Sequence, residues 1–186
     1  MKPVLVDPRY WGDCFRACVA SMLEVPVEEC PHIPSGIEEF HKTCMAPPFA
    51  SLEEYKRNPD KLFESEWWND FCAWWTVTKP KWVKEFEKTW SDWFEERGLV
   101  CHTLAPLNVP IRGYYIAGCE WGPLSHALVM CDGRVVHDPN GYAPDAPEHP
   151  WRIVSLHVIA PRDPSVLTLI LNLRLLRLSL REVPRN

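Results

Sequence analysis

The stretch GDCFRACVASMLEVPVEECP, residues 12–31, decides how the N-terminal part of the chain folds. Its opening Gly12-Asp13 provides a turn and a helix N-cap, and Pro26 lies just beyond the far end of the helical segment. Between these limits, Cys14 to about Glu24 is mostly small and apolar, which predicts a buried, tightly packed helix. From Pro26 to Gly36 we expect a loop with at most one short turn. The predicted helix therefore begins on a cysteine.

Helical patterns continue into the middle of the chain. Short helices are expected near Leu52–Tyr55 and Glu66–Trp75. Pro80 then precedes the clearest helix, from Lys81 to Arg97, whose apolar residues recur at helical spacing. Gly98 is a natural C-terminal stop for that helix.

After Gly98 the pattern changes to short segments rich in β-branched and aromatic residues, which is typical of strands. The segments are Leu99–Leu104, Gly113–Ala117, Ser125–Met130, Arg134–Asp138 and Arg152–Ile159. Helices first and strands second predict an α+β fold, with a helical layer packed on a C-terminal antiparallel sheet. Residues 1–160 are expected to form this domain. The leucine-rich, basic segment 161–186 is either part of it or a tail that docks on a partner.

Composition narrows the class of protein. The chain has 186 residues, 46% hydrophobic and 24% charged, as in a globular protein, and a net charge of −5 that argues against nucleic-acid binding. It shows neither an apolar run that could span a membrane nor a signal peptide. We therefore expect a cytoplasmic protein, and the eight cysteines are thiols, metal ligands or nucleophiles before they are disulfides. The composition does not indicate the oligomeric state.

Cys14 has the surroundings that a catalytic thiol needs. The thiolate is the reactive form of cysteine, and a helix N-terminus helps to stabilise it. A base must exchange its proton, and a third group must orient that base. His126 at the start of one predicted strand and Asp138 at the end of the next are the candidates for these two roles.

The hairpin between His126 and Asp138 has two possible registers. A two-residue turn at Asp132-Gly133 would place the two side chains on opposite faces of the sheet. A three-residue loop with Gly133 left-handed would place them directly opposite each other on one face. The catalytic interpretation therefore predicts the three-residue loop.

At this point the sequence resembles a known class. GDCFRACVASMLEVPVEECP, with SHALVMCDGRVVHDPNG at residues 125–141, is similar to small papain-like cysteine peptidase proteins of phage and bacterial genomes. It is more distantly similar to the double-glycine peptidase domains that process bacteriocins. The resemblance covers about a third of the chain. It implies a papain-like fold with Cys14 as nucleophile, His126 as general base and acid, and Asp138 as orienter, cleaving a peptide, isopeptide or related amide bond without a cofactor.

The resemblance leaves the oxyanion donor open. Papain-like enzymes usually place a glutamine shortly before the nucleophile, and this chain contains no glutamine. The backbone N–H of Cys14 is one candidate donor, and three side chains before it are others: Arg9, Tyr10 and Trp11. Asp13 would repel a developing negative charge unless its side chain is engaged in capping the helix.

The cleft and the cysteines allow further interpretations. Trp11, Tyr115 and Trp121 are candidate walls for a bound protein or peptide substrate. A papain-like scaffold that binds a ligand or protein without turnover is the second hypothesis, and the missing glutamine motivates it. The third is a zinc-stabilised interaction protein, because two cysteines and two histidines lie within fifteen residues: Cys30, His32, His41 and Cys44.

Three further expectations concern packing. Cys18 lies one turn after Cys14 and is expected in the core. His137 is expected to be structural. The tryptophans between residues 67 and 93 are too many for one small core, so some of them are expected to wall a groove or meet a partner.

Overall fold

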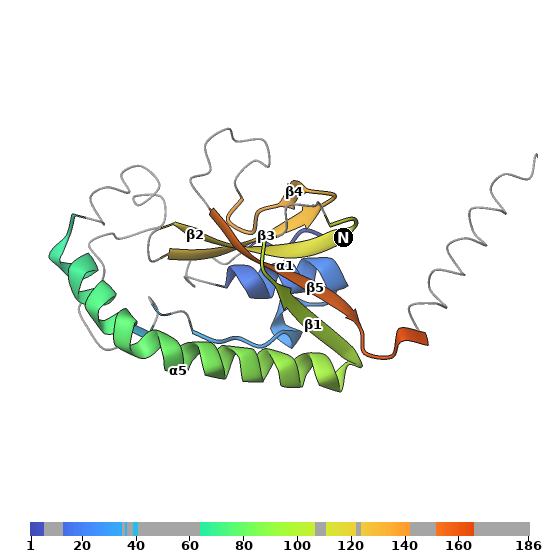
Figure 1. Cartoon of the computed structure of the whole chain (residues 1–186), viewed down its shortest axis with the longest axis horizontal. Coiled ribbons are helices and arrows are strands. Elements are labelled where there is room, and N and C mark those ends of the chain that lie inside the picture. The colour runs from blue at the N-terminus through green and yellow to red at the C-terminus, as the bar shows by residue number, and fades with distance from the viewer. Residues whose placement is uncertain are drawn as a thin grey trace, which may run out of the picture.

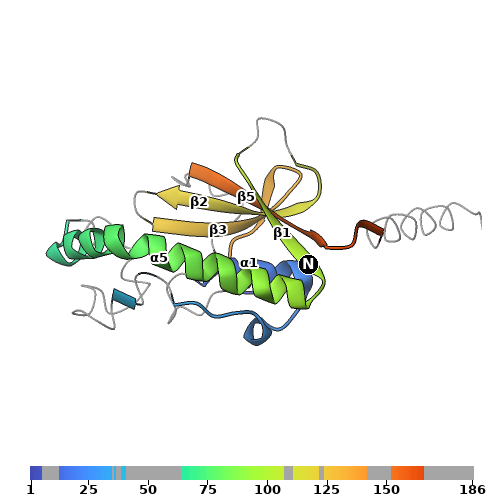
Figure 2. The same ribbon diagram turned by 60° about the horizontal axis from the view of Figure 1, so that its bottom comes forward.

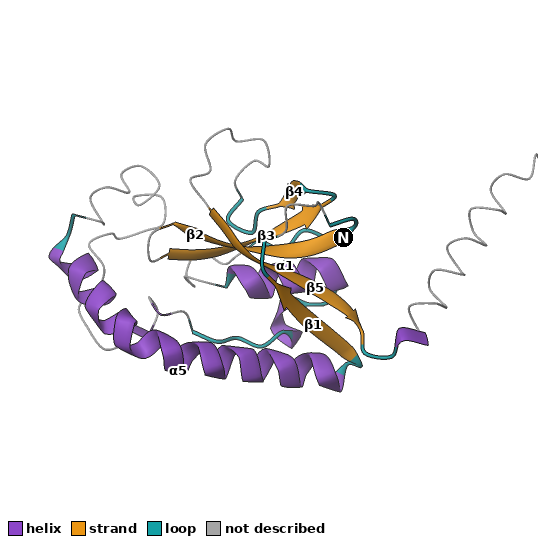
Figure 3. Cartoon of the chain, in the orientation of Figure 1, coloured by secondary structure: helices purple, strands orange, loops and turns teal. Residues whose placement is uncertain are grey.

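The computed structural model describes residues 1–5, 13–34, 36, 39–40, 64–106, 111–121, 124–141 and 152–165. Its main elements are two α-helices, a short 3₁₀ helix and five strands. The α-helices and the strands are labelled in Figures 1 and 3. The helices are α1 (Cys14–Leu23), η1 (Val27–Glu29) and α5 (Glu66–Glu96). The strands are β1 (Leu99–Leu104), β2 (Tyr114–Trp121), β3 (Leu124–Cys131), β4 (Arg134–His137) and β5 (Arg152–Pro161).

The strands form one sheet in the order β1-β5-β2-β3-β4, and each neighbouring pair is antiparallel. The α+β class and the antiparallel sheet are therefore confirmed. The predicted helix at Cys14 and the predicted strands are also present, with β2 longer at its C-terminal end than expected.

Both helices lie on one side of the sheet (Figures 1 and 2). The main core joins Val19 of α1 and Phe94 of α5 to Ile116 of β2 and Val129 of β3. Alternate residues of the same strands, such as Leu128, belong to a separate cluster with Leu156. This alternation follows from the two-residue period of a strand.

The helix α5 is longer than predicted. Pro80 was expected to separate two helices, but it lies inside one continuous helix of 31 residues. Proline in a helix interior removes one backbone hydrogen bond and crowds the preceding turn. Aromatic packing spans the position: the Trp75 and Trp82 rings lie 5.6 Å apart edge to face, and Trp82 stacks on Phe86 at 5.0 Å. These contacts hold both sides of the proline in register, so the predicted break was wrong.

The tryptophans of α5 divide between two clusters, in agreement with the expectation that one core could not hold them. Trp90 and Trp93 enter the main core. Trp68 and Trp75 form a second cluster with Phe40.

The β3–β4 hairpin differs from the predicted register. Cys131 pairs with Arg134, so Asp132-Gly133 is a two-residue turn, and the positive φ values of 51° and 82° identify type I′. The expected three-residue loop was therefore wrong. The register then shifts by one residue, because Met130 pairs with Val135 but Val129 pairs with His137. The extra residue of the bulge moves Asp138 to the side of the hairpin on which it can contact His126.

No helix in the described part of the chain is long and apolar enough to cross a membrane. The helix predicted near Leu52–Tyr55 and the leucine-rich segment from Val166 onward lie outside the described residues.

Candidate active site

Cys14 is the first residue of α1 and is 8% exposed. Its helix packs against β3, where Ala127 and Val129 join the same core cluster as Cys18 and Val19. At a helix N-terminus the partial positive charge of the backbone favours an anion. The packing of α1 on β3 thus brings the Cys14 sulfur to the strand that carries His126.

His126 and Asp138 form a buried pair. The His126 Nε2 atom lies 2.9 Å from Asp138 Oδ1, and the two residues are 5% and 3% exposed. The pairing of β3 with β4 ends at Val129 and His137, so Asp138 is the first residue beyond the paired part of β4. The bulge after the turn, and not the turn itself, brings these two side chains together.

Asp138 is fixed by its own loop. Its Oδ1 also accepts a hydrogen bond from the Asn140 backbone N–H at 2.8 Å, and the Gly141 N–H donates to its carbonyl oxygen at 3.0 Å. Such a side-chain turn holds the carboxylate in one orientation. Its other oxygen, Oδ2, is buried without a hydrogen-bond partner among the described residues.

His126 connects Asp138 to Cys14. Burial acts most strongly on the ring and disfavours its charged form, but hydrogen bonds with Asp138 and Cys14, together with the charges of both, raise the pKa of His126 to about 9. Since Nε2 is engaged by Asp138, the ring nitrogen available to Cys14 is Nδ1. The structure thus brings together the three residues that the sequence singled out.

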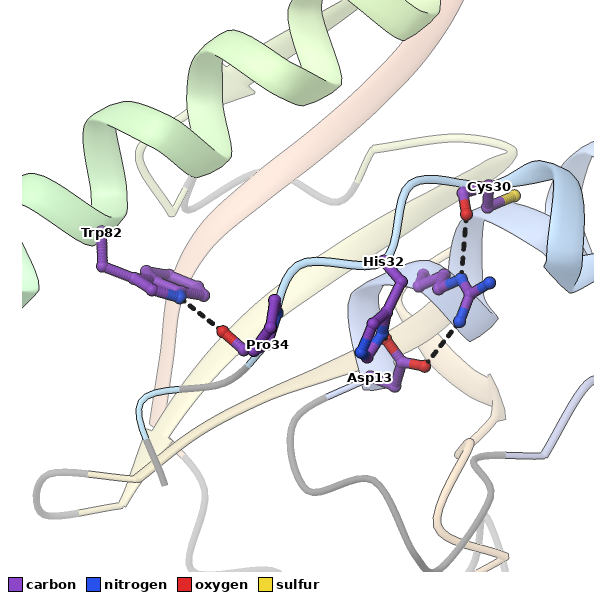
Figure 4. A network of polar contacts seen from close by, with 6 residues as sticks. Asp13, Cys30, His32, Pro34 and Trp82 are labelled. Carbon is purple, nitrogen blue, oxygen red and sulfur yellow. Dashed lines mark hydrogen bonds and ion pairs between the residues drawn. The ribbon is translucent and has the colours of Figure 1, made fainter. Parts of the chain in front are cut away.

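The Asp13 carboxylate is engaged with neighbouring side chains (Figure 4). It occupies the N-cap position of α1 without a side-chain cap hydrogen bond. Its carboxylate instead pairs with Arg16 at 3.0 Å and with His32 Nδ1 at 3.1 Å, while Arg16 Nε donates to the Cys30 carbonyl at 3.0 Å. The guanidinium therefore offsets the negative charge that precedes Cys14. Asp13 thus takes the predicted N-cap position, but its side chain does not cap the helix.

Two further thiols lie around the constellation. Burial, and then the charges of Cys14 and Asp138, raises the pKa of Cys18 well above its ordinary value. The same causes raise the pKa of Cys119 to about 12. Cys119 is paired with His126 across β2 and β3. Both thiols stay protonated at neutral pH, and Cys18 is buried in the core as predicted.

The other candidate substrate residues are placed only in part. Tyr115 is buried in the cluster of Leu128 and Met130, and its hydroxyl is hydrogen-bonded to the backbone of Gly133. Trp121 ends β2, and its side chain lies outside the described part. The three candidate oxyanion side chains also lie outside it: Arg9, Tyr10 and Trp11. His137, expected to be structural, is buried with Nε2 2.8 Å from the Val4 carbonyl oxygen.

Only two of the four residues in the predicted zinc set lie in the described part of the chain. Cys30 is buried, and burial raises the pKa of its thiol to about 11. His32 lies against Asp13, and in Figure 4 the Cys30 side chain points away from its ring. His41 and Cys44 lie outside the described residues, and the residues that are described contain no group of three possible metal ligands.

A second histidine constellation was missed from the sequence. His157 Nε2 lies 3.0 Å from Ser155 Oγ, and its Nδ1 lies 3.1 Å from Thr103 Oγ1. Burial lowers the pKa of His157. The spacing of Ser155 and His157, two residues apart on one strand, was the available signal, but Thr103 joins them only through the β1–β5 pairing.

Comparison of this chain with protein-family models, with curated proteins and with solved structures returned no match.

Proposed function

We propose that the chain is a papain-like cysteine hydrolase that cleaves a peptide, isopeptide or related amide bond. The observation that carries this proposal is the pair of hydrogen bonds made by His126. One joins it to Asp138 at 2.9 Å, and the other joins it to the thiol of Cys14 at the start of α1. A nucleophile, a base and an orienting group in hydrogen-bonding sequence form the arrangement that activates a weak nucleophile.

In the proposed reaction the Cys14 thiolate attacks the carbonyl carbon of the scissile amide, forming a C–S bond. His126, protonated at Nδ1, donates that proton to the leaving nitrogen as the C–N bond breaks. Water then attacks the thioester, His126 takes a proton from it, and the C–S bond breaks to release the acid. Asp138 holds the Nε2–H of His126 and keeps Nδ1 directed to the sulfur.

The negative oxygen formed in the tetrahedral intermediate needs donors. The backbone N–H of Cys14 is the proposed first donor, because it lies at the N-terminus of α1, where the helix dipole also favours negative charge. Asp13 opposes this charge only weakly, since its carboxylate is paired with Arg16 at 3.0 Å. Arg9, Tyr10 and Trp11 remain the proposed sources of a second donor.

The proposal is tested by the reactivity of Cys14. We expect iodoacetamide at pH 6.5 to modify Cys14 at least about tenfold faster than Cys131, a partly exposed thiol of the same protein. His126→Ala should abolish the difference, while His102→Ala, which changes a histidine of β1, should leave it intact. Peptide mapping by mass spectrometry assigns each label.

A second measurement does not depend on access to the buried sulfur. The absorbance of thiolate at 240 nm, taken as the difference between the wild-type protein and Cys14→Ser, should show an anion at pH 6.5. Equal labelling of Cys14 and Cys131, with no thiolate absorbance, would contradict the hydrolase and favour a papain-like binding scaffold.

A further inference from the structure

A groove runs between α5 and the strands β1 and β5, outside the constellation around Cys14. Its volume is about 630 Å³, which is within the usual range for ligand sites. The wall contains Phe15, which follows Cys14 directly, and the α5 side chains Trp82, Phe86 and Trp90. Phe15 meets the His157 ring at 5.2 Å edge to face. The groove thus begins one residue from the proposed nucleophile.

The aromatic wall is held in place before any ligand binds. The Trp82 indole N–H donates to the Pro34 carbonyl oxygen at 2.7 Å (Figure 4), and its ring stacks on Phe86 with 25° between the planes. Phe86 and Trp90 in turn meet Phe15 edge to face at 5.3 and 5.0 Å. Fixed aromatic faces attract cations without an ordering cost at binding.

The strands contribute three polar side chains to the groove, beside apolar ones. Thr103, Ser155 and His157 line it. Because burial lowers the pKa of His157, its ring is uncharged at neutral pH and carries a single N–H. It therefore donates to one hydroxyl and accepts from the other, and both hydroxyl oxygens retain lone pairs that can accept a hydrogen bond from a ligand.

The charged residues of the groove leave an excess of negative charge. The lining contains Glu87, Glu95 and Arg162. Arg162 pairs with Glu95, whereas Glu87 makes no ion pair with any residue in the described part of the chain. Aromatic faces, hydroxyl acceptors and a carboxylate at the rim together complement a positively charged group on an apolar stem.

We propose that this groove binds the lysine or arginine side chain of a peptide, with the alkyl stem along Trp82 and Phe86 and the charged end toward Glu87 and the hydroxyls of Ser155 and Thr103. The subsite role alone rests on the proposed hydrolase: if Cys14 cleaves a peptide, the groove is the subsite that selects a basic residue beside the cleaved bond. Binding itself is independent of cleavage.

The binding test uses the full-length Cys14→Ser protein and four blocked amino acids, the Nα-acetyl methylamides of lysine, arginine, norleucine and glutamate. Chemical shifts of the indole N–H groups follow the titrations. We expect the lysine and arginine compounds to bind at least about tenfold more tightly than norleucine, which has the apolar stem without the charge. The glutamate compound should not bind.

Two variants locate the binding. Glu87→Gln should weaken lysine binding about fivefold and leave norleucine unchanged. Ser91→Trp, an exposed position that lines the groove, should block both basic compounds. Val77→Trp is the matched control, because Val77 is 81% exposed on α5 and does not line the groove.

The proposal is overturned if norleucine binds as tightly as lysine, if no compound binds, or if Ser91→Trp and Val77→Trp have the same effect. None of these results would change the labelling of Cys14 that the hydrolase predicts. Conversely, an unreactive Cys14 with intact lysine binding removes the hydrolase and keeps the groove.

Discussion

The two histidine constellations have the same outline but opposite electrostatics. In one, Cys14 is hydrogen-bonded to His126 and His126 to Asp138; in the other, Ser155 and Thr103 flank His157. Both rings are largely buried, and burial alone disfavours a charged imidazole. Yet the pKa of His126 is raised to about 9, and the pKa of His157 is lowered.

The difference lies in the third group. A carboxylate 2.9 Å from His126 stabilises the imidazolium, whereas a hydroxyl 3.1 Å from His157 stabilises neither form strongly. A histidine that must exchange protons with a thiol benefits from the first environment. A histidine that lines a site for a cation benefits from the second, because a charged ring would repel the ligand. In the two proposed sites, a single neighbour thus decides whether the imidazole is charged or neutral.

The largest effect is expected when His126 loses its charged partner, so that its partners are uncharged like those of His157. Asp138→Asn removes the charge while keeping an oxygen for the Asn140 N–H, so burial should then lower the pKa of His126 to below about 7. Alkylation of Cys14 at pH 7 should slow at least about twofold, since at that pH a pKa of about 9 leaves nearly every His126 ring charged and a pKa below 7 leaves fewer than half of them charged. Asp132→Asn in the same hairpin is the control and should change neither quantity. An unchanged titration of His126 in Asp138→Asn, followed by NMR, would show that the carboxylate does not set its charge.

The two histidines should also give pH dependences of opposite sign. The folded-state pKa of His126, about 9, lies above its ordinary value of 6.5, so its contribution is fully present below pH 6.5 and is lost as the pH rises toward 9. The free energy of unfolding of the wild-type protein should therefore fall over this window by up to about 3 kcal/mol relative to His126→Gln.

For His157 the folded-state pKa is lowered, so its contribution is present above pH 6.5 and is lost as the pH falls below that value. His157→Gln should remove this acid-side loss. Urea unfolding between pH 5 and 8 measures both slopes before the buried thiols titrate. The stability difference between the wild-type protein and each variant should therefore change with pH in opposite directions for His126→Gln and His157→Gln. A change in the same direction would show that the pKa values of the two histidines are not shifted in opposite directions.

A smaller effect should follow from crowding the second constellation. A Cβ atom at Gly118 would lie 2.3 Å from Ser155 Oγ and 3.3 Å from His157 Nε2. Gly118→Ala should therefore reduce the free energy of unfolding by about 1–3 kcal/mol, because the Ser155 hydroxyl must move and give up its contact with His157. Adding Ser155→Ala should recover most of the loss, since the remaining Ser155 atom, Cβ, lies 3.6 Å away. If the double variant is no more stable than Gly118→Ala alone, the hydroxyl is not the source of the strain.

How much of this arrangement the sequence predicts depends on how local each feature is. The helix at Cys14 and the strand β1 follow from periodicity and from flanking turn residues, and both are present at the expected positions. The three residues Cys14, His126 and Asp138 were selected by residue type and by the order of elements. Their association required that α1 pack on β3 and that β3 pair with β4 with a bulge at Val136, which residue type and element order do not show.

The features that sequence reasoning missed depend on contacts between distant segments. The continuity of α5 through Pro80 rests on Trp75, Trp82 and Phe86 packing across the proline, which overrides a local preference. The bulge in β4 is not marked by glycine, since Val136 is the extra residue. Asp13 meets His32 only because the loop after α1 returns to the helix start. Propensity is local, whereas these outcomes are decided by tertiary packing.

The smallest effect is expected when His157 gains a carboxylate partner like that of His126. Thr103→Asp places a carboxylate near Nδ1 of His157 and should raise the pKa of that histidine toward its ordinary value. The change is smaller than that at His126 because Thr103 is exposed on β1 and water screens the new charge. Thr103→Asn, which has the same shape without the charge, is the control and should leave the pKa unchanged in the same NMR titration. If Thr103→Asp and Thr103→Asn titrate alike, then burial alone, and not the third group, distinguishes the two histidines.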